Sequence, residues 1–263
     1  MSDKNSSFID FPDLPASIDN AVKNLTDKPT QGIGQTFADA WYLVFGGITQ
    51  AADKRRMKYA HDLELYKQEL SRAISSIPEE KRIEPNIQTT AQALENSKYC
   101  IESEELRKMF VNLISNSMDN RYIQNVHPSF AEIIKQMSPT DARILKTLRP
   151  KSILPLVDYV LENSQNHDYE TELSTVYISS LSDVSLENAS FSISSLERLG
   201  IITINKNSFI PNESIYIPYE ETTYYKDFSL KAISRYASKR ANIHKYLGSF
   251  TPLGENFYEV CVK

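Results

Sequence analysis

The chain has 263 residues, of which 24% are charged, and its formal net charge is −5. This length suffices for one large domain or two ordinary ones, with a substantial core. Residues 1–138 hold 16 basic and 19 acidic side chains, and residues 139–263 hold 13 and 15. Neither half therefore has the basic excess that is typical of a protein that coats DNA.

The two cysteines, Cys100 and Cys261, are far apart in the sequence. Neither belongs to a CxxC motif, and neither lies near clustered histidines. This spacing argues against a zinc site and fits a reducing compartment. The first residues, MSDKNSSFIDFPD, lack the basic-then-apolar order of a signal peptide. We therefore expect a cytoplasmic protein without a metal ion or another cofactor.

Residues 1–30 are polar and punctuated by proline, so we predict a loosely ordered segment there, followed by a helical domain over residues 31–138. An apolar stretch from Phe37 to Ile48 opens this domain and supports two interpretations. It is either a core helix or a membrane-contacting face. The membrane interpretation would use two aromatic side chains and the basic cluster that follows, namely Trp41, Phe45, Lys54, Arg55 and Arg56. Twelve residues are too few to span a bilayer, and we favour the core helix.

A long helix is predicted from Asp53 to Ile77. Its apolar residues step by threes and fours and form one stripe: Tyr59, Leu63, Tyr66, Leu70, Ala73, Ile74 and Ile77. The stripe can pack within the monomer as one arm of a helical hairpin, or it can join two copies of the chain. We favour the hairpin, because the stripe is shorter than three full heptads.

Residues 98–148 contain three helix patterns that are separated by short breaks. Ser103 is placed to cap the first helix, whose buried face we predict to comprise Leu106, Met109, Phe110, Leu113, Ser117 and Met118. A second helix is predicted to open at His127-Pro128. A third has a capping signal at Ser138-Pro139, with Asp141 reaching back.

The same residues carry a resemblance to a known family. The runs LRKMF, SNSMDN, VHPSF and QMSPTDARIL follow one another in this order. Together they resemble the Abi-alpha family, a bacterial group whose name comes from abortive infection, or phage exclusion. The resemblance extends upstream through Ile77-Pro78-Glu79-Glu80 and Pro85 and downstream to the last dozen residues. It implies a role in phage defence, and it implies no catalytic residues.

One polar cluster is worth weighing as a site. Asp119, Asn120, Arg121 and His127 fall in one predicted loop, and Arg107 lies in the helix before it. An acid, an amide, an arginine and a histidine could perform acid–base or phosphodiester chemistry. They could equally cap helix ends and fix the loop, and we favour that interpretation. Since no familiar catalytic motif is present, we predict that the protein is not an enzyme.

After Arg149-Pro150 the pattern changes, and we predict a second domain over residues 139–263. Ser152–Leu161 is interpreted as a strand at a sheet edge, because Pro155 cannot donate to a ladder. Asn163–Glu172 is predicted to be a polar loop, and Leu173–Leu181 a short helix.

A helix over Glu187–Leu199, a strand over Ile201–Ile204 and a return at Phe209-Ile210 resemble a winged helix. The fold class is therefore predicted as mainly α: a helical domain followed by an α+β, winged-helix-like domain. The helix in the recognition position carries one basic residue, Arg198, so we expect packing or protein contact there in preference to DNA binding.

One basic run lies between residues 226 and 245. Lys231, Arg235 and Lys239 step by four, so a helix would align them on one face, with Leu230, Ile233, Ala237 and Ala241 turned inward. A solvated surface is the simplest explanation. The alternative is contact with phosphate on nucleic acid or lipid, through Lys231, Arg235, Lys239, Arg240 and Lys245. At the end of the chain Thr251 is predicted to cap a last helix that buries Phe257, Val260 and Cys261.

Three functional hypotheses follow. The first is a cytoplasmic phage-defence protein that acts through contacts with an unknown protein, which could be phage-derived, or with a second copy through residues 53–77. The second is an effector bound peripherally at the inner membrane through Phe37–Ile48. The third, which we disfavour, is nucleic-acid binding through the basic run.

Overall fold

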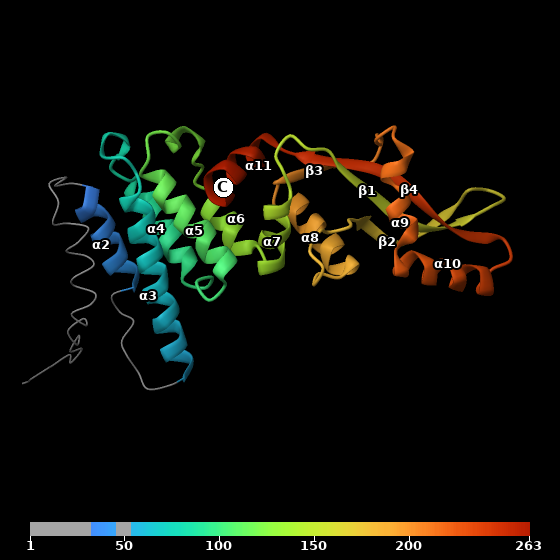
Figure 1. Ribbon diagram of the computed structural model, residues 1–263, viewed down its shortest axis with the longest axis horizontal. Coiled ribbons are helices and arrows are strands. Elements are labelled where there is room, and N and C mark those ends of the chain that lie inside the picture. The colour runs from blue at the N-terminus through green and yellow to red at the C-terminus, as the bar shows by residue number, and fades with distance from the viewer. Residues whose placement is uncertain (1–32, 46–53) are drawn as a thin grey trace, which may run out of the picture. The chain divides into compact units, whose positions relative to one another are not determined.

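The structure is a computed structural model that describes residues 33–45 and 54–263. The predicted N-terminal tail and Ile48 lie outside the described residues. The chain divides into two compact units between Lys135 and Gln136 (Figure 1). They are the N-terminal and the C-terminal unit.

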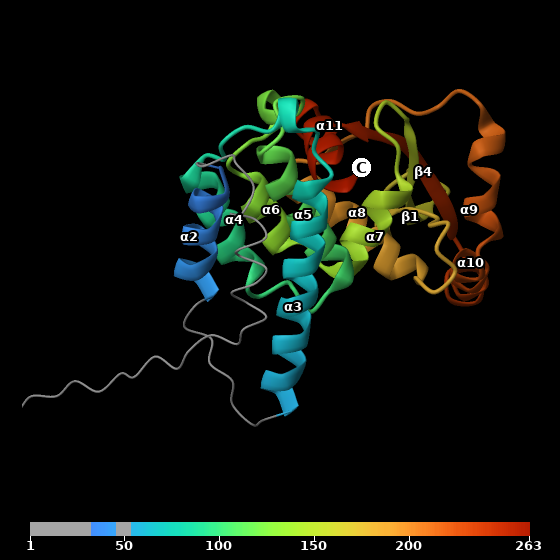
Figure 2. The ribbon, with the colours of Figure 1, turned by 60° about the vertical axis from the view of Figure 1, so that its left-hand side comes forward.

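The N-terminal unit is helical. Its α-helices are α2 (Ile33–Phe45), α3 (Lys54–Ser75), α4 (Ile87–Ser97), α5 (Glu104–Ser117) and α6 (Phe130–Gln136), the last ending at the unit boundary, with short 3-10 turns η1 (Glu79–Lys81) and η2 (Ile123–Asn125). α3 packs against α5, and α4 lies against both α2 and α5 (Figure 2). The predicted helical domain is thus built from packed helices.

Local sequence signals set the helix ends of this unit. Ser103 caps α5, because its side chain accepts a hydrogen bond from the amide of Leu106. The predicted inner face is confirmed, since all six of its residues are buried. α6 begins at Phe130, two residues after the predicted start at Pro128.

The stripe of α3 is used inside the unit. Tyr66, Leu70, Ile74 and Ile77 are buried, whereas Tyr59 and Leu63 are partly exposed. The ring of Tyr66 lies 5.7 Å from that of Trp41 on α2, and Trp41 in turn lies 4.5 Å from Phe45. This core forms where α2 meets α3 through these rings and where α3 packs against α5, each with its amphipathic face.

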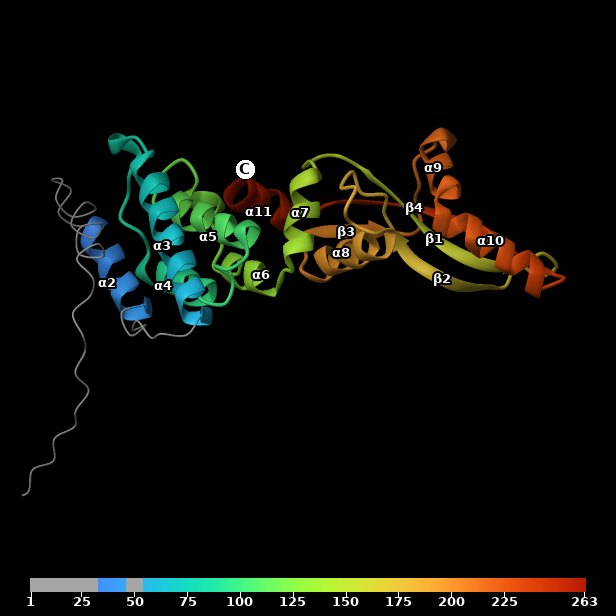
Figure 3. The same cartoon turned by 60° about the horizontal axis from the view of Figure 1, so that its bottom comes forward.

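The C-terminal unit is mixed. It contains α7 (Pro139–Thr147), β1 (Leu154–Asn163), β2 (Tyr169–Val176), α8 (Leu186–Arg198), β3 (Ile202–Asn205), η3 (Glu213–Ile215), α9 (Ile217–Glu221), α10 (Thr223–Arg235), β4 (Lys239–Phe250), α11 (Pro252–Phe257) and a final π-helical turn η4 (Tyr258–Val262). Ser138 and Asp141 form the predicted capping box at the start of α7. The four strands form one antiparallel sheet in the order β2-β1-β4-β3. α8 packs on α7 and β2, and α10 lies against β4 (Figure 3).

β1 is a central strand, so the predicted edge position is wrong. It pairs with β4 along its whole length and with β2 from Val157 onward. Pro155 lies before the first residue of β1 that pairs with β2. At this position β1 has β4 as a neighbour on one side and no strand on the other, so a residue without an amide hydrogen is tolerated as it is at a sheet edge. A proline is therefore compatible with a central strand at this point.

Two further predictions in this unit are wrong. Leu173–Leu181 is not a helix, because β2 runs to Val176 and pairs with β1. The return predicted at Phe209-Ile210 is not a strand, and β3 pairs with β4 instead. β2 thus occupies part of the segment predicted as a helix between α7 and α8, the second strand of the predicted wing does not form, and the winged-helix arrangement is not confirmed.

The basic run also folds differently from the prediction. α10 ends at Arg235, and Tyr236 is already extended. β4 then begins at Lys239, opposite Asn163 of β1. β4 pairs with β1 along residues 239–248 and with β3 along residues 247–250, and these pairings between distant segments set its extended conformation. The inner face of α10 is formed by Phe228 and Ala232, whereas Leu230 and Ile233 are exposed.

Tyrosines form much of the core between the sheet and α9–α10. Tyr159, Tyr216 and Tyr219 are buried there, and each hydroxyl donates a hydrogen bond to a backbone carbonyl, as buried phenols require. Burial raises the pKa of Tyr159 to about 12, so this phenol stays protonated at neutral pH. At the chain end, Thr251 caps α11 as predicted, and Phe257, Val260 and Cys261 are buried.

Candidate functional surfaces

Arg107 is an internal anchor. The side chain is buried in α5, and its Nε and Nη2 donate to the two carboxylate oxygens of Glu69 on α3 at 2.9 and 3.2 Å. Its Nη1 donates to the carbonyl of Ile101 at 2.8 Å, in the connection between α4 and α5. This bidentate geometry joins three segments and leaves no exposed face of the guanidinium for a ligand.

Asp119 and Arg121 are brought together, as the sequence suggested. Asp119 is 1% exposed, and its carboxylate accepts from both Nε and Nη2 of Arg121 and from the Arg121 amide. The Arg121 hydrogen bonds hold the pKa of Asp119 below its usual value. The loop is also tied to the segment after α3, since the amide of Asn120 donates to the carbonyl of Lys81.

His127 is not part of this cluster. The ring is exposed, and its Nδ1 contacts the hydroxyl of Ser129 at 2.7 Å and accepts from the Ser129 amide at 3.1 Å, just before α6. The side chain of Asn120 is likewise exposed. The four polar residues therefore serve two separate local turns, which favours the structural interpretation of the loop.

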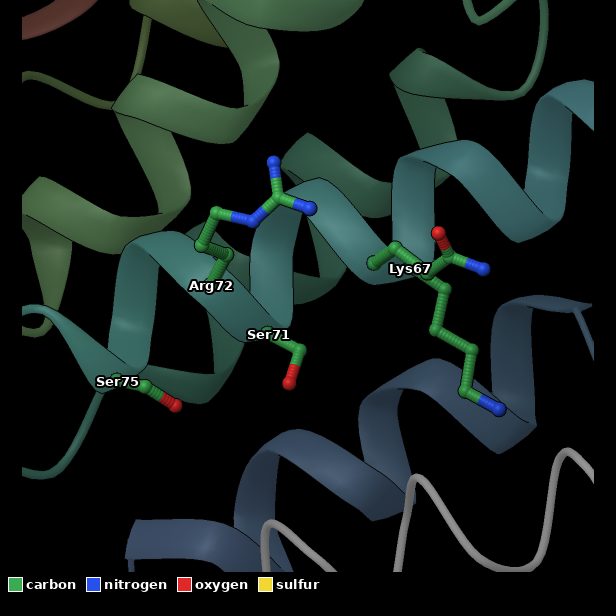
Figure 4. Close-up of a pocket in the computed structure, with 5 residues that line it drawn as sticks. Lys67, Ser71, Arg72 and Ser75 are labelled. Atoms are coloured by element: carbon green, nitrogen blue, oxygen red, sulfur yellow. The ribbon is translucent and has the colours of Figure 1, made fainter.

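A hollow of about 300 Å³ lies along α3 and is lined by Lys67, Gln68, Ser71, Arg72 and Ser75. Figure 4 shows that the Lys67 ammonium extends toward α2, whereas the Arg72 guanidinium extends to the other side of α3. Two cations that diverge cannot clamp one anion. We therefore do not assign a ligand to this hollow.

The residues considered for membrane contact are placed in the core. Trp41 is 7% exposed and Phe45 is 3% exposed, and both pack against Tyr66. The core-helix interpretation of residues 37–45 fits this packing, and neither ring is available to a bilayer. The side chains of Lys54, Arg55 and Arg56 lie outside those that the structure describes.

The basic run is divided between two elements, so the predicted single face is wrong. Lys231 and Arg235 are exposed on α10. On β4, Lys239 forms an ion pair with Glu170 at 2.6 Å, Lys245 pairs with Glu213, and Arg240 donates to nearby backbone carbonyls. The ion pair with Glu170 raises the pKa of Lys239.

The outer face of α8 is poor in cations. Phe191 is 71% exposed at the centre of this face, and Glu187 lies one turn before it. Arg198, the basic residue of this helix, donates to the side chain of Gln136 at 3.0 Å. This surface lacks the several phosphate contacts on which DNA affinity depends.

A buried polar cluster that the sequence analysis missed surrounds Asp158 in the middle of β1. Its carboxylate accepts from the hydroxyl of Tyr246 at 2.6 Å, from Nζ of Lys206 at 2.6 Å and from the amide of Thr175 at 2.9 Å. Burial, and then the hydrogen bond to Asp158, raise the pKa of Tyr246 well above its ordinary value. A lone acid within the apolar run ILPLVDYVL was the signal for this cluster, because a buried carboxylate requires donors.

The backbone is strained at the same place. Thr175 has a φ of 57°, which is rare for a β-branched residue. The pairing of β1 with β2 shifts register on both sides of Tyr159, which marks a bulge. In this bulge the Thr175 amide points at the Asp158 carboxylate and donates a hydrogen bond to it. A hydrogen bond to a charged group thus offsets part of the cost of the strained backbone at Thr175.

A second missed cluster surrounds Glu162 near the end of β1. Its carboxylate contacts Nδ1 of His167 at 2.9 Å and accepts from the side-chain amide of Asn242 at 2.5 Å, while Nε2 of His244 lies 3.9 Å away. These contacts, led by the Asn242 hydrogen bond, lower the pKa of Glu162. Within residues 33–45 and 54–263, no three histidine, cysteine or acidic side chains are placed to hold a metal ion.

No helix among the described residues is both long enough and apolar enough to cross a bilayer.

Comparison with known proteins addresses the family. The family model described as abortive infection alpha matches residues 58–261, a range that covers most of the chain and includes residues of both units. Neither the curated proteins nor the solved structures contain a match to the chain. The resemblance seen in the four sequence runs is thereby confirmed, and the chain belongs to the abortive infection alpha family.

Proposed function

We propose that the protein takes part in phage defence by abortive infection, and that it acts through contact with another protein and not by catalysis. The match to the abortive infection alpha family over residues 58–261 is the observation that carries the first part. The second part is our inference from how the polar and apolar side chains are used.

The side chains considered for catalysis have structural partners. Arg107 is occupied by Glu69 and the Ile101 carbonyl, and Asp119 by Arg121. A general acid or base must reach a substrate, and the Asp119 carboxylate is buried behind its own loop. These contacts support a role in holding the N-terminal unit together.

The outer face of α8 supports a protein contact. The inner face buries Ala189, Ile193 and Leu196, so the helix is fixed and the exposed ring of Phe191 is presented on a rigid element. Exposed aromatic side chains of this kind often dominate the energy of protein interfaces. The scarcity of free cations on α8 favours a protein over a nucleic acid as its partner.

Phage challenge of bacteria that express the full chain tests this proposal. We expect wild-type protein to lower plaque formation by at least one phage of a panel. We expect Phe191→Ser to lose most of the protection, while Phe209→Ser, which changes an exposed ring elsewhere in the same unit, retains it. The absence of protection across the panel would contradict the defence role. Full protection by Phe191→Ser would contradict the contact through α8.

A further inference from the structure

The exposed ring of Phe191 on α8 has acidic side chains beside it. Glu187 lies four residues before Phe191 and is also exposed, and residues four apart on a helix are neighbours on its surface. α8 packs on β2, and β2 carries a second exposed acid, Glu172. The outer face of α8 and the neighbouring part of β2 thus combine one aromatic ring with two carboxylates.

Tyr224 of α10 connects the two acids. The Tyr224 hydroxyl lies close to the carboxylates of both Glu172 and Glu187, although these come from different elements. Burial raises the pKa of Tyr224, and the two carboxylates raise it further, so the phenol stays protonated at neutral pH. The Tyr224 ring stacks on Tyr159 of the core at 5.9 Å, which fixes its position. Phe191, Glu187, Tyr224 and Glu172 therefore follow one another across one surface of the C-terminal unit.

The two acids of this surface have no basic partner. Glu170, two residues before Glu172 on β2, forms an ion pair with Lys239. Over residues 33–45 and 54–263, by contrast, no lysine or arginine forms an ion pair with Glu172 or Glu187. Two carboxylates close to one another repel each other and attract a cation from outside the chain.

We propose that the partner bound by the outer face of α8 is a basic protein segment, in which lysine or arginine side chains pair with Glu172 and Glu187 while an apolar side chain packs on Phe191. This inference rests on the protein contact proposed above for α8 and specifies the chemistry of the partner. Complementary charges steer two proteins together and set the register of the contact, and an aromatic ring next to them supplies affinity.

Charge also decides against the other possible occupants. A nucleic acid or an anionic membrane would be repelled by Glu172 and Glu187. A second copy of the chain, joined by two-fold symmetry, would present the same surface and so bring the same acids together across the interface. Like charges in an interface are costly, so the chain is a poor partner for itself at this surface.

An NMR titration of the full chain with short synthetic peptides tests the proposal. The probe is a peptide that contains both lysine and leucine. One companion peptide has glutamate in place of lysine, and the other has serine in place of leucine. We expect the lysine–leucine peptide to shift the amide signals of Glu172, Glu187 and Phe191 and to bind more weakly as salt is raised. Each companion should bind at least about tenfold more weakly.

Glu172→Lys with Glu187→Lys is the decisive variant. It should weaken binding of the lysine–leucine peptide by at least about tenfold and should bind the glutamate–leucine peptide instead. The matched control is Glu197→Lys with Glu220→Lys, which makes the same charge change at exposed positions of the same unit and should bind like the wild type. Circular dichroism melts of both variants check that they are folded.

Three results would overturn the proposal. Wild-type protein that does not prefer the lysine–leucine peptide would exclude a basic partner. Unchanged binding by the Glu172/Glu187 variant would place the contact elsewhere, and equal loss in the Glu197/Glu220 control would show that overall charge decides. Phage challenge separates this failure from that of the contact itself. If the Glu172/Glu187 variant protects fully while Phe191→Ser does not, the basic partner is refuted and the contact through α8 stands.

Discussion

Each unit of the protein has a carboxylate whose hydrogen bonds link distant segments, and the two are held in different ways. In the N-terminal unit, both oxygens of Glu69 depend on one partner, the guanidinium of Arg107. In the C-terminal unit, Asp158 has three donors from three segments: Tyr246, Lys206 and the Thr175 amide.

The two carboxylates differ in the number of hydrogen-bond partners that hold them. A buried charge whose single partner is removed is left uncompensated, which is costly even when the intact pair contributes little net stability. A charge with several donors can lose one and remain hydrogen-bonded. We therefore expect the N-terminal unit to be the more sensitive to the loss of one polar side chain.

The largest effect is expected for Arg107→Met, which leaves the carboxylate of Glu69, 25% exposed, without its donor and also removes the hydrogen bond to the Ile101 carbonyl. We predict that the free energy of unfolding of the N-terminal unit falls by about 2–4 kcal/mol, less than for a fully buried charge because water reaches Glu69. Urea titration followed by the fluorescence of Trp41 measures it, because this is the one tryptophan of the chain and it packs inside that unit.

The double variant Glu69→Met with Arg107→Met is the control for this prediction. With both charges removed, stability should return to within about 1–2 kcal/mol of the wild type. If the double variant is as unstable as Arg107→Met, the loss comes from packing or from the Ile101 carbonyl and not from a stranded carboxylate.

The next effect is expected for Tyr246→Phe. This change removes one hydrogen bond to the Asp158 carboxylate, and we predict a loss of about 1.5–3 kcal/mol in the C-terminal unit. Hydrogen exchange of the β1 and β4 amides measures it locally. Unchanged protection of these amides would show that the Tyr246 hydroxyl contributes nothing to the cluster.

A smaller effect is expected for Lys206→Met. The Lys206 side chain is 57% exposed, so its ion pair with Asp158 is weakened by water, and the other two donors remain. We predict a loss below about 1 kcal/mol. A loss as large as that of Arg107→Met would refute the idea that several donors make Asp158 tolerant.

The smallest effect is expected from the titration of Asp119. Its pKa is lowered in the folded state, so it stabilises the fold above its unfolded pKa of about 3.9, and this contribution is lost as the pH falls through the folded pKa. The stability difference between wild type and Asp119→Asn should be constant above about pH 5 and should shrink below about pH 4. Denaturation at a series of pH values measures it, and a difference independent of pH would contradict the assigned cause.

The sequence predicted correctly those features that depend on residues a few positions apart, namely helix caps and the buried face of a helix. The cap at Ser103, the capping box at Ser138 and the cap at Thr251 each involve residues within three positions, and all three predictions are confirmed. The buried face of α5 follows from the helical period in the same way.

The errors concern pairings between distant segments. β4 is a strand because β1 and β3 pair with it, and nothing within residues 239–250 shows those partners. β2 had a visible signal, since Tyr169, Thr171, Leu173 and Thr175 alternate as strand formers do.

The candidate sites divide in the same way. The contact between Asp119 and Arg121 spans two residues and was predictable as a cluster, whereas the partners of Asp158 come from distant segments. Only the acid in an apolar run pointed to that second cluster. The exposure of Leu230 on α10 also depended on where the helix packs, which its own sequence left ambiguous.

Photo-crosslinking at position 191 during phage infection tests the central claim most directly. A photoreactive residue at 191 should give one discrete protein adduct in protected cells, and the same residue at 209 should give none. Phe191→Ser should lose protection. When co-expressed with the crosslinking chain, it should also fail to lower the yield of the adduct, whereas the wild-type chain should lower it by competing for the partner. Protection that persists without any adduct at 191 would contradict a mechanism based on protein contact through α8.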